Sequence, residues 1–308
     1  MNKPTLSVVV ASDRAGGRLL ECVAALLAQG GPDPMQIIVA DCSGDGLVGE
    51  IGNPTGAVEV VRFSQRVPWP TLLAAGLQRA RGDFVAILEA RCVPQIGWAG
   101  ALRHALRQSN TVVGGVVEFE GRAKLVDWAA YFCDYGQFMR PWPTGTVREL
   151  PGNNCAFPRV LLEKYPEYTQ PGFWKTFFLW QVQEREGVRL LAVPAMAVGY
   201  RREFRSSFEF LARRFHHARC FGAMRRARLS STQRRRYTLL APLLPPLLPP
   251  LLPPLLLWRT FRKVWPKARY RLRLIRSLPL IGLAGVVWTA GEWLGHMVGP
   301  GSSCQKVK

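Results

Sequence analysis

The chain has 308 residues, 48% of them hydrophobic, which is long enough for one large domain or two smaller ones with an ample core. The net charge is +20, and because residues 201–276 hold 20 Lys or Arg against only Glu203 and Glu209, this basic tail fits an anionic partner, either phospholipid or nucleic acid. Seven scattered cysteines without a Cys-x-x-Cys pair argue against a disulfide framework or a zinc site and fit a reducing compartment.

Short apolar runs alternate with amphipathic stretches over the first 110 residues. The apolar runs predict buried strands, and apolar residues at helical spacing predict helices between them. The expected strands are 6–11, 35–43, 57–64 and 84–90, and the expected helices are 16–30, 69–83 and 97–109. This alternation predicts an α/β fold with a mostly parallel sheet flanked by helices on both faces.

The pattern becomes less regular in the following residues. In chain order, 111–121 predict a strand, 125–143 a mostly helical segment, 150–165 a turn and a short helix, and 176–201 a helix followed by a strand. This part of the chain therefore extends the sheet without continuing the regular alternation.

The tail contains two long apolar stretches separated by the basic residues 259–276. Residues 237–258 carry no charge over the length of a membrane span, but repeated Leu-Leu-Pro-Pro units disfavour a straight helix. Residues 278–298 are apolar except for Glu292 and His296. The positive-inside bias favours a membrane-resting or re-entrant tail with both basic segments on the cytoplasmic side, and two full spans stay open. Because no nucleic-acid module is recognisable, we expect an anionic membrane surface as the partner and no nucleic acid.

Polar side chains follow three of the predicted strands. Open α/β sheets bind ligands at the carboxyl ends of their strands, so these side chains define the expected site. The three groups are Ser12-Asp13-Arg14, Asp41-Cys42-Ser43 and Glu89-Ala90-Arg91.

Four ordered segments resemble the family-2 glycosyltransferases of the GT-A fold: LSVVVASDR, LLECVAALLAQ, QIIVADCSGDG and ARGDFVAILEARCVPQIGWAGAL. The later LPGNNCAFPRVLLEKY is similar to the acceptor-side segment of that family, and REGVRLLAVPAMAV to the helix, glycine and strand that close its catalytic domain. The resemblance implies a GT-A (Rossmann-like) domain over residues 1–202, with a nucleotide-binding half at 1–110 and an acceptor half at 111–202. We expect the rest to form a basic helical linker (203–236), a membrane-associated region (237–300) and a tail (301–308).

The family implies inverting transfer from a nucleotide-diphosphate sugar, usually with a divalent cation such as Mg²⁺ or Mn²⁺. The leaving diphosphate needs a metal or cationic side chains, and an acceptor hydroxyl needs a general base. Together with the tail, the resemblance implies a lipid-linked or polysaccharide acceptor, as in a cell envelope, at the cytoplasmic face of the cell membrane. The alternative is a glycosyltransferase-like binding or scaffold protein that kept the fold and lost catalysis.

The resemblance assigns nucleotide-sugar contacts to the ends of the first two strands. Ser12 and Asp13 fall where the family contacts the nucleotide, although Asp13 also suits a helix N-cap. Asp41 falls at the acidic position that binds the base and ribose, although aspartate also favours local turns. On the acceptor side, Asn153 and Asn154 are candidates for binding sugar hydroxyls or phosphate oxygens, with turn chemistry as the alternative.

Glu89 and Arg91 fall at the Asp-x-Asp-like position of the family, whose last acidic residue normally binds the cation. Mg²⁺ and Mn²⁺ prefer oxygen ligands, so Glu89 can supply one metal ligand, whereas Arg91 repels a cation. Arg91 can instead bind the donor diphosphate as a bidentate guanidinium. An ion pair on the surface is the remaining interpretation of these two charges.

Two further positions depart from the family. The acidic pair that includes the general base would fall near Lys175 and Thr176, where the chain has no carboxylate, and Glu184 and Glu186 lie on another turn of the helix. Tyr200 replaces the His that follows the closing strand in the family. The general base therefore stays unassigned.

Overall fold

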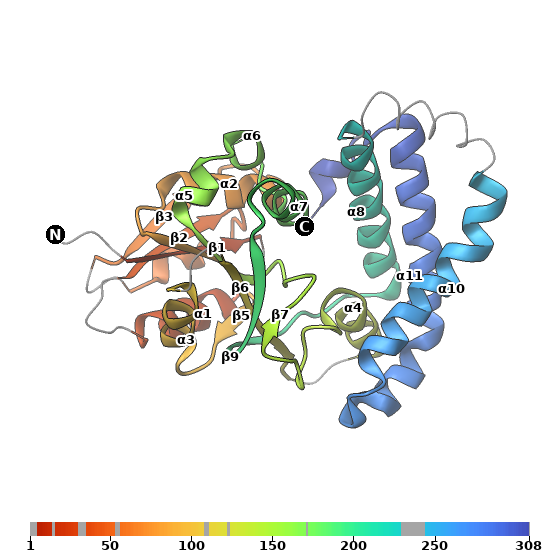
Figure 1. Ribbon diagram of the computed structural model, residues 1–308, viewed down its shortest axis with the longest axis horizontal. Coiled ribbons are helices and arrows are strands. Elements are labelled where there is room, and N and C mark those ends of the chain that lie inside the picture. Colours follow the sequence, from red (N-terminus) through yellow and green to blue (C-terminus); the bar gives the residue numbers. More distant parts are fainter. Residues whose placement is uncertain are drawn as a thin grey trace. The chain divides into compact units, whose positions relative to one another are not determined.

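The computed structural model describes residues 5–13, 16–29, 35–52, 56–107, 111–121, 124–170, 172–228 and 244–307, and only the backbone of 244–252. The chain divides into two compact units (Figure 1). The first unit comprises Met1–Glu120 and Phe138–Arg201, and the second comprises Gly121–Gln137 and Arg202–Lys308. The segment Gly121–Gln137 belongs to the second unit, whereas the sequence led us to expect it in the acceptor half, residues 111–202.

The first unit is built on a nine-stranded sheet with the order β3-β2-β1-β4-β8-β6-β9-β5, in which β7 also pairs with β9. The strands are β1 (Leu6–Ser12), β2 (Met35–Asp41), β3 (Val58–Arg62), β4 (Phe84–Glu89), β5 (Cys92–Pro94), β6 (Thr111–Phe119), β7 (Gly145–Thr146), β8 (Asn154–Pro158) and β9 (Arg189–Tyr200). Strands β3, β2, β1 and β4 run parallel, as do β6 and β9, whereas β8 is antiparallel to β4 and β6. The predicted mostly parallel α/β sheet is confirmed.

Helices cover both faces of this sheet. They are α1 (Arg18–Leu27), η1 (Leu47–Glu50), α2 (Trp69–Arg79), α3 (Trp98–Leu106), α5 (Arg159–Glu163), α6 (Pro166–Thr169) and α7 (Lys175–Glu186). Figure 1 shows α1 and α3 on one face and α2, α5 and α7 on the other. All seven residues of β1 are buried, because a strand covered on both faces has no solvent side, and five of the seven are apolar.

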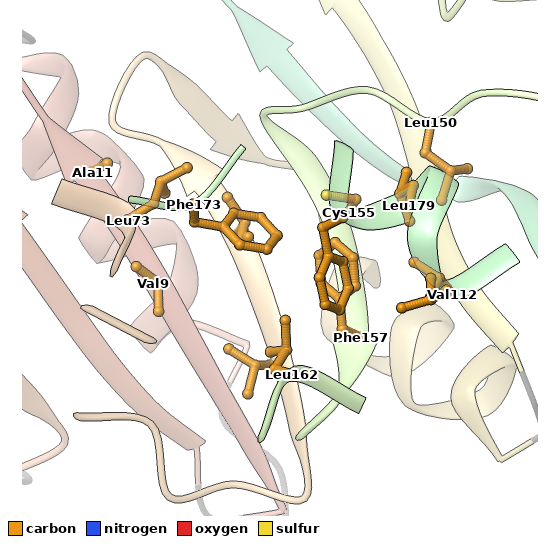
Figure 2. Close-up of a cluster of buried hydrophobic side chains, with 14 of the residues drawn as sticks. Val9, Ala11, Leu73, Val112, Leu150, Cys155, Phe157, Leu162, Phe173 and Leu179 are labelled. Carbon is orange, nitrogen blue, oxygen red and sulfur yellow. The ribbon is translucent and has the colours of Figure 1, made fainter. Parts of the chain in front are cut away.

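A hydrophobic core joins the sheet to α2, α5 and α7 (Figure 2). The Phe157 ring of β8 packs edge-on against Phe173 and Phe178, with ring centroids 5.7 and 5.6 Å away. Burial of each phenylalanine stabilises the fold by about 1.5–3 kcal/mol. Because Phe178 belongs to the first turn of α7, this core fixes the start of that helix and therefore the backbone of Lys175.

The second unit is helical, and its longest helices approach closely at glycines. It contains α4 (Leu125–Tyr135), α8 (Ser207–Ala227), α10 (Leu244–Val264), η2 (Ala268–Tyr270), α11 (Arg271–Val298) and η3 (Ser303–Lys306). A Cβ added to Gly291 would lie 2.5 Å from the Phe215 carbonyl oxygen, and one added to Gly295 would overlap the Arg219 carbonyl. A Gly-x-x-x-Gly spacing in an apolar helix is typical of such close packing. Within the described residues, one helical stretch is long and apolar enough to cross a membrane, Ala268–Val298, and 39% of its apolar window is buried.

Two features of the second unit differ from the sequence expectations. Cys220 and Cys304 form a disulfide, which could not be predicted because the two residues lie 84 positions apart in the sequence. The other five cysteines are free thiols. The Pro-Pro pairs of residues 244–258 lie within α10, although proline disfavours a helix interior. This helix packs closely on α11, since a Cβ added to Gly285 would lie only 3.4 Å from Pro253. Helix propensity describes local preference and does not include such tertiary contacts. Residues 237–243 of the predicted apolar stretch lie outside the described residues.

Candidate functional site

The residues predicted to bind the donor lie at one edge of the sheet. The strand register pairs Ser12 with Asp41 and Ala11 with Glu89, so the carboxyl ends of β1, β2 and β4 meet there. The five expected donor residues are 1–8% exposed: Ser12, Asp13, Asp41, Glu89 and Arg91. Arg14 lies outside the described residues. The structure therefore brings the five described donor residues together in a buried, charged cluster.

Arg91 links the ends of β1 and β4. Its Nη1 donates hydrogen bonds to Asp13 Oδ1 and to Glu89 Oε1, both at 2.7 Å. Burial alone would lower the pKa of Arg91, but the Glu89 and Asp13 carboxylates raise that pKa above its ordinary value, so the guanidinium stays charged. Because all three side chains are buried, Glu89 and Arg91 are not the surface ion pair considered from the sequence.

The end of β9 supports the turn that carries Arg91. The backbone N–H of Arg201 donates to the Arg91 carbonyl oxygen at 3.3 Å. Tyr200 is buried beside Cys92, with which it pairs in the β5–β9 ladder, and its ring meets Phe119 edge-on at 6.5 Å. The residue that replaces the histidine of the family therefore packs next to the Arg91 turn.

A second guanidinium, which the sequence analysis did not identify, approaches from the loop after β3. Arg66 Nη2 lies 3.7 Å from Asp13 Oδ2, and the Arg66 side chain is 32% exposed. A 3.8 Å contact from Cys42 Sγ to the Val67 carbonyl oxygen holds this loop beside the end of β2. Arg66 comes just after the predicted strand 57–64, and the other site residues also follow predicted strands. Its place after a strand could therefore have identified Arg66 as a candidate.

The carboxylate of Asp41 is only partly satisfied by the protein. Ser43 Oγ lies 3.0 Å from Asp41 Oδ2. Asp41 Oδ1 is buried and has no hydrogen-bond partner among the described residues, and the same holds for Ser12 Oγ. A buried polar group without a partner costs about 1–3 kcal/mol, so an N–H or O–H of a ligand would be stabilising here. The ends of β1 and β2 thus offer a polar position that a nucleotide can complete.

Asn154 is fully engaged in holding the sheet together. Its Nδ2 donates to the carbonyl oxygens of Val116 and Met196 at 3.0 and 2.8 Å, and its Oδ1 accepts from Trp98 Nε1 at 2.9 Å. These bonds cross the register shift between β6 and β9. The geometry therefore assigns Asn154 to the fold.

Asn153 is the asparagine whose geometry suits ligand binding. It directly precedes β8, whose first residue pairs with Leu88 of β4, so it lies at the same edge as Glu89. Asn153 Nδ2 lies 3.2 Å from Cys92 Sγ. Its Oδ1 is buried without a hydrogen-bond partner in the described part of the chain.

Lys175 stands near the position at which the resemblance implies a general base. Its Nζ donates to the carbonyl oxygen of Leu150, at the start of the turn that leads to Asn153. Burial lowers the pKa of Lys175 below its ordinary value, and the nearby Cys155 and Glu149 only partly offset that effect. Of the two carboxylates on another turn, Glu186 ends α7 and bonds Lys164 and Tyr165.

The described residues do not fit the divalent cation that the resemblance implies. Asp13 and Glu89 supply the carboxylates at the junction of β1 and β4, and Arg91 already holds one oxygen of each. Across the part of the chain that the structure describes, there is no group of three or more His, Cys, Asp or Glu that could hold a metal ion. The arrangement therefore does not support Glu89 as a metal ligand.

The family is decided by comparison with known proteins. The model for glycosyl transferase family 2 matches residues 7–165, just over half of the chain. The chain belongs to glycosyl transferase family 2. The match covers β1, β2, β4 and β8, and the resemblance to this family seen in the sequence is confirmed. No curated protein matches the chain in sequence.

Solved structures show the same fold. This family-2 glycosyltransferase is similar to the mannosyltransferase PcManGT from Pyrobaculum calidifontis, solved in complex with GDP-Man and Mn²⁺, with 17% identity and a TM-score of 0.56 over 92% of this chain and 87% of that chain. It also matches residues 1–349 of S. aureus TarS, with 13% identity and a TM-score of 0.49 over 91% of this chain and 90% of that chain. At 17% identity the likeness to PcManGT supports the GT-A fold alone.

Proposed function

We propose that this family-2 glycosyltransferase moves a sugar, with inversion, from a nucleotide-diphosphate donor to a lipid-linked or polysaccharide acceptor at the cytoplasmic face of a membrane. The observation that carries the donor part is the buried Asp41 Oδ1, which has no partner among the described residues. A base N–H or a ribose hydroxyl can donate to it. The similar PcManGT was solved with GDP-Man, which supports a nucleotide sugar as the donor class.

The proposed reaction is a single displacement at the anomeric carbon. The acceptor oxygen forms a bond to that carbon while the bond to the diphosphate oxygen breaks, and the nucleotide diphosphate leaves with the electron pair. The charge that develops on the diphosphate requires cationic groups, and Arg91 and Arg66 are the two guanidiniums that contact Asp13. An acceptor hydroxyl must lose its proton, and Lys175, whose pKa is lowered by burial, stands near the position at which the resemblance implies the base that accepts it.

The second unit supports the membrane part of the proposal. Its stretch Ala268–Val298 contains an 18-residue window with a mean hydropathy of 1.5, which is apolar enough to span a membrane, and the neighbouring sequence is rich in arginine. A basic segment beside an apolar helix is attracted to anionic lipid. An acceptor attached to lipid would be presented at that surface. Flotation with anionic liposomes tests this part, and a chain that stays at the bottom of the gradient contradicts it.

The donor part is tested with a thermal-shift panel of nucleotide sugars on the full chain. A donor at 100 times its Kd should stabilise the folded protein by about 2.7 kcal/mol, which raises the Tm. Sugar transfer or slow donor hydrolysis should then be measured with the nucleotide sugar that gives the largest shift. A folded chain that no nucleotide sugar stabilises would refute the proposal.

A binding or scaffold protein with the same fold is the second candidate. The observation that favours it is Lys175, which stands near the implied general-base position without a carboxylate beside it in α7. Under this alternative, the thermal-shift panel would still identify a nucleotide ligand. Prolonged incubation with that nucleotide sugar would release neither sugar nor nucleotide diphosphate, whereas measurable turnover would exclude the alternative.

A further inference from the structure

The junction of β1 and β4 is an acidic pair closed by a guanidinium. Arg91 Nη1 lies 2.7 Å from Asp13 Oδ1 and 2.7 Å from Glu89 Oε1. The side chains of these residues are only 10%, 3% and 7% exposed, respectively. One nitrogen of a charged guanidinium therefore occupies the point at which the two carboxylate oxygens converge.

This point is where a divalent cation would need its protein ligands. Mg²⁺ and Mn²⁺ require oxygen ligands and bind through one or two carboxylates together with the phosphates of the substrate. Here one oxygen of each carboxylate accepts a hydrogen bond from Arg91. A cation bound there would also face the positive charge of the guanidinium at close range.

The charge balance leads to the same conclusion. Arg66 Nη2 lies 3.7 Å from Asp13 Oδ2 and adds a second guanidinium. Two guanidiniums balance the two carboxylates of Asp13 and Glu89, so this group of four has no net negative charge to attract a dication. The Arg66 side chain is 32% exposed, so it is the more accessible of the two guanidiniums.

We propose that Arg91 takes the place of the divalent cation and that, together with Arg66, it binds the donor diphosphate, so that donor binding requires no metal. Guanidinium is permanently charged, and its planar donors match phosphate oxygens in a bidentate geometry. The carboxylates of Asp13 and Glu89 orient Arg91 toward this role. This inference rests on the proposed function, because it concerns the diphosphate of the nucleotide-sugar donor.

The first test measures Mn²⁺ binding directly and needs no nucleotide. Electron paramagnetic resonance of free Mn²⁺ is followed while the wild-type chain, Arg91→Asp and Arg81→Asp are added. Arg81 is the matched control, because its side chain is 71% exposed and lies on the surface beside Glu59. We expect only Arg91→Asp, which adds a third carboxylate at the junction, to bind Mn²⁺ stoichiometrically. Stoichiometric Mn²⁺ binding by the wild-type chain would overturn the inference.

The second test holds even when Arg91→Asp fails to fold. Calorimetric titrations of UDP and GDP are run on the wild-type chain and on Arg66→Ala, each in EDTA and in Mn²⁺. We expect the wild-type affinity for the bound nucleotide to be the same in both conditions, and Arg66→Ala to weaken it at least about tenfold while the chain stays folded. Binding that appears only with Mn²⁺ would overturn the inference and leave the proposed function standing. A folded wild-type chain that binds neither nucleotide in either condition would refute both.

Discussion

The ends of β2 and β4 both place a buried carboxylate at the carboxyl edge of the sheet, yet the protein satisfies the two carboxylates differently. At the β4 end, which we call the Arg91 corner (Asp13, Glu89 and Arg91), two carboxylates share one guanidinium. At the β2 end, the Asp41 corner (Asp41 and Ser43), one carboxylate oxygen has no hydrogen-bond partner among the described residues. The difference teaches that a buried charge at a strand end indicates a ligand most directly where the protein leaves an atom unsatisfied.

The comparison has a functional meaning. The Asp41 corner is the proposed nucleotide-binding position, whereas the Arg91 corner has a cation built into the chain. The first corner should therefore matter for ligand binding alone, and the second for both folding and binding. The following predictions test that separation.

The largest effect is expected for Arg91→Ala. Removal of the guanidinium leaves Asp13 and Glu89 buried without their shared partner, which should lower the free energy of unfolding by about 3–5 kcal/mol. Urea denaturation followed by circular dichroism measures this loss, with Arg81→Ala as the exposed control. Equal stability of the two variants would show that the Arg91 corner is not a buried charge network.

A smaller effect, confined to binding, is expected for Asp41→Ala. Loss of a charged acceptor for a ligand N–H or O–H should weaken nucleotide binding about 10-fold to 100-fold, since such a hydrogen bond contributes about 1.5–3 kcal/mol. Calorimetric titration with the nucleotide identified in the panel measures the loss. Asp45→Ala is the matched control, because Asp45 caps the exposed turn through its contacts with Ser43 and Leu47. Equal weakening in both variants would remove Asp41 from the site.

Lys175→Met should alter the pH dependence of stability. Burial lowers the pKa of Lys175 in the folded chain, so below the ordinary value of 10.5 the unfolded chain binds more protons than the folded chain. The unfolding free energy of the wild-type chain should therefore rise relative to that of Lys175→Met as the pH increases from the lowered pKa toward 10.5. Chemical denaturation of both proteins at a series of pH values measures the difference.

Lys164→Met is the control for that series. A hydrogen bond to Glu186 raises the pKa of Lys164 in the folded chain. Its removal should change the pH dependence in the opposite direction, because a raised pKa stabilises the fold below the ordinary value and that stabilisation is lost as the pH rises. The same slope for Lys175→Met and Lys164→Met would contradict the burial of the Lys175 ammonium.

The smallest effect is expected for Ser43→Ala. Ser43 Oγ lies 3.0 Å from Asp41 Oδ2 and 2.8 Å from Asp45 Oδ1, and its single proton can bond only one of them at a time. Removal should weaken nucleotide binding by no more than about fivefold, which corresponds to a net hydrogen bond of about 1 kcal/mol. The same titration measures it. A loss as large as that of Asp41→Ala would mean that Ser43 itself contacts the ligand.

The parallel part of the fold was predictable from local pattern. The unbroken apolar runs of β1, β2 and β4 arise because helices cover both faces of these strands. The positions of Asp13, Asp41 and Glu89 follow, because parallel strands bring their carboxyl ends to one edge of the sheet. The sequence could thus locate the edge at which the site residues gather.

The contacts within that edge were not predictable, because they join residues far apart in the chain. The bridge from Arg91 to Asp13 spans 78 residues, and the bonds of Asn154 follow from the register shift between β6 and β9. Arg66 comes from a loop without periodicity. The position of Gly121–Gln137 in the second unit and the disulfide between Cys220 and Cys304 likewise depend on long-range packing.

The central claim is that the chain binds a nucleotide diphosphate at this edge through guanidinium groups, without a divalent cation. The most direct measurement is one pair of calorimetric titrations of the wild-type chain with the nucleotide identified in the panel, in EDTA and in Mn²⁺. The account predicts equal affinities, because Arg91 already lies 2.7 Å from both carboxylates at the junction. An affinity that falls at least about tenfold in EDTA and returns with Mn²⁺ would contradict it.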